Sequence, residues 1–215
     1  MPSALLRKQS LHVERPLPWA LDFIITMPEN KLSEFMKGFS GAVELHNRAN
    51  ANGSFIESVC LGASIIDGVL RIGINLKHQI DTKSDEQLEE LLQQEETDKI
   101  ITERQVYKIA LDKGVIDKDI FESLEKLYKD RNRVVHRYII SKITTEEVLN
   151  IAIEYDSTIR TVNTRIEELE KKQIEMGVGM TVNLEDEDEA VKEWIESMAK
   201  EKHGNEELSK KLRKK

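Results

Sequence analysis

The sequence holds few glycines and prolines, few aromatic residues and one cysteine. Its 215 residues include 10 glycines and 4 prolines, about 6.5% together, whereas ordinary chains contain about 12%. Turn-rich sandwiches, propellers and collagen-like chains need far more of both residues, so β-rich architectures are disfavoured. Charged residues make up 33% of the chain and aromatic residues 5%. This balance is typical of amphipathic helices with solvated outer faces and predicts an all-α protein.

The single cysteine limits the chemistry further. Cys60 alone can form neither an intramolecular disulfide nor a thiolate metal cluster, so we expect a reducing cytoplasm as the compartment. We expect no signal peptide and no membrane span, because Asp22 interrupts the short apolar run at 19–27 and the apolar stretch 55–80 carries four charges. The histidines show no paired metal-ligand spacing, and we expect no metal and no cofactor.

Periodicity divides the chain into three parts. Residues 1–29 hold all four prolines and predict an irregular arm. Residues 30–177 carry helical patterns and predict an up-down helical bundle, in which the apolar stretch 55–80 is the central helix. Residues 178–215 predict an acidic linker, a short amphipathic helix around Trp194 and a basic tail.

Within the bundle, local signals mark where helices begin and end. Thr102 and Gln105 have capping-box spacing, and either Asp117 or Asp119 can cap a helix that continues to about residue 138. The polar stretch 84–96 predicts an outer helix or a partly ordered crossing. From Val148 to Leu169 the apolar residues step alternately by four and three, which predicts one long helix over 145–176. Its apolar seam is interpreted as core, with an oligomer interface as the alternative.

Charge singles out one segment. The net charge of −8, from 32 basic and 40 acidic residues, argues against a general cationic surface for nucleic acid. Between Lys126 and Lys142, however, six basic residues accompany one acidic residue, a local net charge of +5. This segment is a candidate anion site.

Arg131 and His136 within this segment could cleave a phosphodiester. A guanidinium offers a rigid fork of donors to phosphate oxygens, and an imidazole with a pKa near about 6.5 exchanges protons at neutral pH. On an unbroken helix the two side chains would lie about 140° apart and would not converge. Either the backbone breaks near residues 132–134, or a second copy of the chain completes the cleft.

The run Arg131-Asn132-Arg133-Val134-Val135-His136 resembles the R-x4-6-H signature of HEPN domains (higher eukaryotes and prokaryotes nucleotide-binding). Tyr138 extends it to the R-x4-H-x-Y form of HEPN toxins that are paired with minimal nucleotidyltransferase antitoxins. The resemblance covers roughly residues 30–170. It implies an up-down helical bundle that forms a homodimer, with the signatures of the two copies facing each other.

The resemblance also implies an activity and its residues. It implies a metal-independent endoribonuclease of a toxin-antitoxin or antiviral defence system, which leaves a 2′,3′-cyclic phosphate on its RNA substrate. His136 would activate the ribose 2′-hydroxyl, Arg131 would hold the phosphate, and Asn132 would orient the pair. Tyr138 would be the regulatory position at which an antitoxin attaches AMP. The further RNA contacts expected in this segment are Lys129, Arg133 and Arg137.

Other interpretations remain open for these residues. Arg131 could pair with Asp130 or Glu125 at a helix end while His136 packs at a turn, in a non-catalytic HEPN-like module that binds a nucleotide or a protein. Arg133 and Arg137 could belong to a solvated face. Three further predictions concern packing: Val134 and Val135 are core contacts, Cys60 is inert core, and Asp67 pairs with Arg71, with orientation of His136 as the alternative role of Asp67.

Overall fold

The computed structural model describes residues 31–92 and 98–179, and the described residues form six helices and no strand. The all-α prediction is confirmed. The predicted arm, acidic linker, helix around Trp194 and basic tail lie outside the described residues. The helices are α2 (Lys31–Asn52), α3 (Phe55–Thr82), α4 (Glu89–Leu92), α5 (Glu103–Asp112), α6 (Lys118–Arg137) and α7 (Thr145–Met176).

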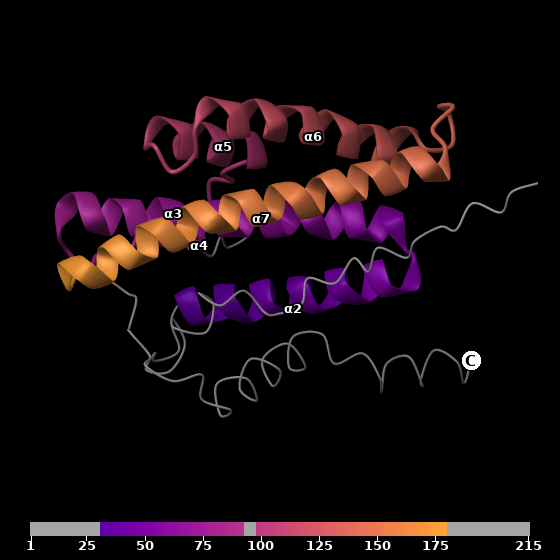
Figure 1. Ribbon diagram of the computed structural model, residues 1–215. Helices are drawn as coiled ribbons and strands as arrows, with labels where there is room; N and C mark the ends of the chain where they lie inside the picture. Colours follow the sequence, from indigo (N-terminus) through magenta and orange to yellow (C-terminus); the bar gives the residue numbers. More distant parts are fainter. Residues whose placement is uncertain (1–30, 93–97, 180–215) are drawn as a thin grey trace, which may run out of the picture.

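Figure 1 shows the helices in three layers, with α5 and α6 on one side, α3 and α7 in the middle, and α2 on the other side. Along the chain α2, α3, α6 and α7 run in alternating directions. The α2–α3 turn and the α6–α7 connection therefore lie at the same end of the bundle (Figure 1). We call this end, with residues 53–57 and 138–148, the turn end.

Helix α3 is the central helix, as predicted. It contacts each of the other five described helices, and most of its apolar side chains are buried, Ile66, Leu70 and Ile74 fully so. By length and composition α3 could cross a membrane, but 78% of its most apolar window is buried inside the bundle. Gly73 permits the close approach of α7, because a Cβ atom at this position would lie 2.3 Å from Ile166 Cδ1.

Helix α7 has the predicted bounds, and its heptad seam is core. Six of the seven seam residues are buried, and Leu169 packs against the core from its edge; the six are Val148, Ala152, Tyr155, Ile159, Val162 and Ile166. At its start, the Thr144 hydroxyl accepts the Glu147 N–H at 3.2 Å and the Glu147 carboxylate accepts the Thr144 N–H at 2.8 Å. At its end, Gly177 takes the left-handed conformation with φ of 63°.

The segment before α5, for which the sequence predicts an outer helix or a partly ordered crossing over 84–96, contains one short helix among its described residues. Of its described residues only Glu89–Leu92 form a helix. Long side chains from α3 hold it: Asn75 Oδ1 accepts the Leu88 N–H at 2.7 Å, and Arg71 Nη1 donates to the Leu91 carbonyl at 3.0 Å. Side chains of the central helix thus satisfy backbone groups that a longer helix would have satisfied internally.

Candidate functional site

The signature segment lies on the last two turns of α6, which runs unbroken from Lys118 to Arg137. Asp117, one of the two predicted caps, accepts the Ile120 N–H at 3.0 Å and starts this helix. Of the two alternatives, a backbone break near residues 132–134 is therefore excluded, and a cleft completed by a second copy stays a prediction. Because the helix continues through the segment, Arg131 and His136 project in directions about 140° apart.

Arg131 faces the neighbouring helix α5. Its guanidinium pairs with the Glu103 carboxylate and lies over the Tyr128 ring, with Cζ 5.0 Å from the ring centroid. The side chain is 22% exposed. The alternative interpretation, in which Arg131 forms an ion pair, named Asp130 or Glu125 as the partner, but the partner is Glu103. Glu125 instead binds Arg104, Nη2 to Oε2, at 2.6 Å.

The Arg131 pair belongs to a half-buried cluster of charges between α3, α5 and α6. Burial raises the pKa of the Glu103 carboxyl, while the Tyr107 hydroxyl and the Arg131 guanidinium, both bonded to it, act to lower that pKa. Burial also raises the pKa of Tyr107, and the Glu103 charge raises it further. Arg131 thus neutralises a carboxylate that would otherwise be costly to bury.

The predicted pair of Asp67 and Arg71 is confirmed. Arg71 Nε lies 2.6 Å from Asp67 Oδ2, and the guanidinium also donates to the Leu91 and Ile101 carbonyls. Burial raises the pKa of Asp67, and Arg71 opposes that shift. Among the described residues no hydrogen bond joins Asp67 to His136, so the geometry supports the structural role of Asp67.

His136 is on the opposite side of α6 from this cluster and is exposed on its last turn. Lys129 and Arg137 are exposed as well, whereas Asn132 and Arg133 are half-buried. Arg133 lies 3.7 Å from an oxygen of Asp130 and 3.7 Å from one of Glu147. The structure thus places an imidazole and cationic side chains toward solvent, but in one chain it does not bring His136 and Arg131 together.

The two valines of the signature differ. Val134 is buried in the core as predicted, but Val135 is 40% exposed, so the prediction for Val135 is wrong. Consecutive residues of a helix project about 100° apart, and only one face of α6 packs against the core. Val134 lies on that face, and Val135 therefore points away from it. Cys60 is half-buried, so the prediction that it belongs to the core is wrong, and burial raises the pKa of its thiol.

Tyr138 lies just beyond α6, at the turn end. Its ring is 41% exposed and borders a hollow of about 470 Å³. The other walls of the hollow are the α2–α3 turn, the start of α3 and the first turn of α7.

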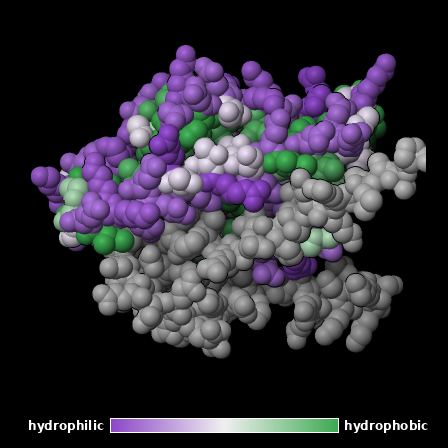
Figure 2. All heavy atoms as spheres, in the orientation of Figure 1, coloured by the Kyte–Doolittle hydropathy of each residue, from purple (hydrophilic) through white to green (hydrophobic). Residues whose placement is uncertain are grey.

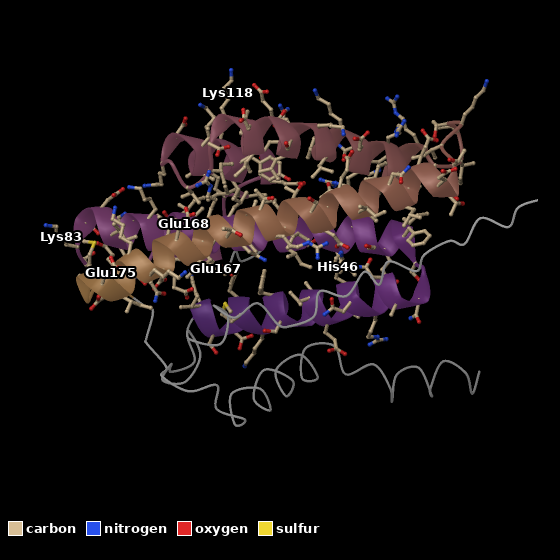
Figure 3. The ribbon with its side chains drawn as sticks, in the orientation of Figure 1. His46, Lys83, Lys118, Glu167, Glu168 and Glu175 are labelled. Atoms are coloured by element: carbon tan, nitrogen blue, oxygen red, sulfur yellow. The ribbon has the colours of Figure 1, made fainter. Side chains whose placement is uncertain are left out.

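The sequence reasoning missed a buried polar cluster between α2, α3 and α7. Figure 3 shows His46 between α2 and the middle layer. Ser58 Oγ donates to Asn50 Oδ1 at 2.5 Å, and His46 Nε2 lies 3.3 Å from Ser58 Oγ and 3.5 Å from Asp156 Oδ1. The one available signal was spacing: His46 and Asn50 lie on the same face of α2 as Met36 and Phe39.

Serine, histidine and aspartate together resemble a hydrolytic triad by residue type, but their geometry is different. In a triad the serine and the aspartate use opposite ring nitrogens, whereas here both lie at Nε2. The three side chains are also buried. Burial lowers the pKa of His46 to about 4 and raises the pKa of Asp156, so the cluster is a structural network around a neutral imidazole.

Neither protein-family models, nor curated proteins, nor solved structures give a match to this chain. Within residues 31–92 and 98–179, no three histidine, cysteine or carboxylate side chains are grouped as metal ligands would be.

Proposed function

We propose that the protein is a metal-independent endoribonuclease of the HEPN type, which acts as a homodimer in a toxin-antitoxin or antiviral defence system. The observation that carries the proposal is the exposed His136 on the last turn of α6, within a segment whose net charge is +5. Exposed cations there attract the phosphates of RNA, and an exposed imidazole can reach the ribose.

The chemistry needs one base, one acid and a positive charge. His136 takes the proton of the ribose 2′-hydroxyl, whose oxygen attacks the adjacent phosphorus. The bond from phosphorus to the 5′-oxygen breaks, and the 5′-oxygen takes a proton from a water molecule, which the protonated His136 then reprotonates. The products are a 2′,3′-cyclic phosphate and a 5′-hydroxyl. Proton transfer by a placed imidazole contributes about 10²–10⁴-fold to such a rate.

The guanidinium that stabilises the phosphate comes from the second copy in this proposal. Within one chain, Arg131 and His136 diverge on an unbroken helix. The bond to Glu103 uses Nη2 of Arg131, and a guanidinium has five N–H donors in all. Glu103 therefore holds Arg131 in place while further donors serve a phosphate that lies across a dimer cleft, where Asn132 orients the pair.

Tyr138 is the proposed regulatory residue, two positions beyond His136. Its exposed ring is accessible to a nucleotidyltransferase antitoxin. Attachment of AMP there would place negative charge beside the cleft and would exclude the RNA phosphate.

A second candidate function rests on the same arginine. Because Arg131 is half-buried and neutralises Glu103, its role is fully explained by structure. This favours a non-catalytic helical module that binds a nucleotide or a protein partner.

RNA cleavage in EDTA separates the two candidates. The full chain and its His136→Ala variant are incubated with a defined RNA, and product ends are analysed for the cyclic phosphate. Lys118→Ala is the matched control, since Lys118 is an exposed residue at the other end of α6 (Figure 3). We expect cleavage by the wild type and the control and a loss of about 10²–10⁴-fold in His136→Ala. Equal cleavage by all three proteins, or no cleavage by the wild type, would remove the nuclease proposal.

A further inference from the structure

Exposed apolar side chains are concentrated at the turn end of the bundle. Ile139 is 95% exposed, Ile140 is 81% exposed, and Tyr138 and Ile56 are 41% and 40% exposed. Val135, on the last turn of α6 beside this end, is 40% exposed. Figure 2 shows hydrophobic side chains at the surface at the end where α6 joins α7. Exposed apolar patches of this kind mark places where another surface binds.

A hollow lies beside the two isoleucines. The hollow of about 470 Å³ is lined by apolar atoms of Phe55, Ile56 and Val148, and Tyr138 stands at its edge. Since Tyr138 lines the hollow and directly precedes Ile139, the exposed isoleucines and the hollow lie close together at the turn end. At about 30 Å³ for a water-sized group the hollow has room for about fifteen such groups, and two isoleucine side chains contain eight carbon atoms.

We propose that the turn end is the surface on which two copies of this chain pair, with Ile139 and Ile140 of each copy in the hollow of the other. A two-fold interface uses the same patch on both subunits, so that patch must carry both a projection and its complement. The turn end carries both side by side. A different partner protein would require only one of the two.

Charge complementarity supports a second copy as the occupant. Arg137 and Lys142 flank the isoleucines, and both are exposed. Glu57, at the edge of the hollow, is exposed as well. The ion pairs among the described residues include none of these three side chains. When the isoleucines of one copy enter the hollow of the other, Arg137 and Lys142 approach Glu57 of the other copy. This attraction favours pairing with a second copy over pairing with a different protein.

This inference deepens the proposed function and rests on its homodimer. His136 is two residues before Tyr138, so pairing at the turn end brings the two copies of His136 to one interface. The same pairing places both Tyr138 rings beside the contact. A nucleotide attached to Tyr138 would then act on dimer contacts as well as on RNA.

Sedimentation equilibrium of the full chain tests the surface. The test variant carries Ile139→Asp and Ile140→Asp, and the control is Ile100→Asp, since Ile100 is 70% exposed away from the turn end. We expect dimers of the wild type and the control, and a dissociation constant roughly 30-fold or more larger for the test variant. At a concentration low enough that all three are monomeric, they should melt at similar temperatures, because the substituted side chains are exposed in the single chain.

Charge exchange provides a second test. Glu57→Lys and Lys142→Glu should each weaken the dimer, and the two together in one chain should restore it. A monomeric wild type would overturn the inference, and so would a dimer that survives the aspartate pair. If the wild type is monomeric and the Ile139→Asp, Ile140→Asp variant melts at a lower temperature, a segment of the same chain covers the isoleucines instead of a second copy. A dimer that responds to these substitutions as expected but cuts no RNA would support the proposed pairing surface and contradict the nuclease proposal.

Discussion

Arg131 on α6 and Glu103 on α5 form an ion pair that joins the signature segment to the rest of the bundle. The pair is mostly buried, with side-chain exposures of 22% and 17%, and Tyr128 and Tyr107 pack and bond around it. The guanidinium is therefore held in place by the fold, and in the proposed reaction it is fixed before RNA binds. Preorganised donors of this kind need no reorganisation to stabilise a developing charge.

We expect Arg131 and Glu103 to be energetically coupled. Arg131→Gln leaves the Glu103 carboxylate without its cation, and Glu103→Gln leaves the Arg131 guanidinium without its anion. Each variant should therefore lower the free energy of unfolding by about 1–3 kcal/mol. The double variant should lose less than the sum of the two, by about 0.5–3 kcal/mol. Urea unfolding of the four proteins measures this coupling.

The matched control is the exposed pair of Lys126 and Glu154, whose Nζ and Oε2 atoms are 2.8 Å apart. Its coupling should be below about 0.5 kcal/mol, because both side chains are largely in water. Additive effects at Arg131 and Glu103 would contradict the view that the pair fixes the guanidinium.

Acid should weaken the fold through His46. Burial lowers the pKa of His46 from 6.5 to about 4, so between those values the unfolded chain binds a proton that the folded chain does not. Stability is then full above about pH 6.5 and falls as the pH decreases toward 4, by up to about 3 kcal/mol. Burial raises the pKa of Asp156, Asp67 and Glu103, and these carboxyls act with the opposite sign.

Comparison with His46→Gln isolates the histidine from the carboxyls. Glutamine can still bond to Ser58 but does not titrate, so this variant should lose less stability between pH 6.5 and 4 than the wild type. Thermal melts across that range measure the difference. Parallel curves for the two proteins would show that His46 does not contribute to the acid sensitivity.

Two glycines should respond oppositely to alanine. At Gly73 a Cβ atom would meet Ile166 Cδ1 at 2.3 Å and Val115 Cγ1 at 2.8 Å, so Gly73→Ala should force α7 away from α3 and cost about 1–3 kcal/mol. At Gly38, inside α2, a Cβ atom would meet no atom of the described residues within 4 Å apart from the helix's own backbone. Gly38→Ala should therefore stabilise the protein by about 0.5–1 kcal/mol, because alanine loses less backbone entropy in a helix. Denaturant unfolding checks both signs.

The parts of the fold that the sequence predicts are those fixed by local patterns. The heptad seam predicts α7, and in the structure its ends coincide with a capping box at Thr144 and a left-handed Gly177. The central position of α3 follows from its apolar composition. Both signals come from residues that are close together in the chain, where spacing determines which side chains share a face.

The parts that could not be predicted depend on residues far apart in the chain. Arg131 binds Glu103, 28 residues away, whereas spacing suggests only close neighbours such as Asp130 and Glu125. The short α4 depends on Arg71, 20 residues before the Leu91 carbonyl that it binds. Such contacts follow from the packing of helices rather than from the pattern within one helix.

Subunit mixing tests the central claim, that Arg131 of one copy and His136 of the other form one RNA-cleaving site. Arg131→Gln and His136→Ala chains, each inactive alone, are denatured together in equal amounts, refolded and assayed on RNA in EDTA. Half of the dimers should then be mixed, each with one intact pair across the interface, and about a quarter of the wild-type activity should return. No recovered activity in mixtures that contain folded mixed dimers would contradict the account.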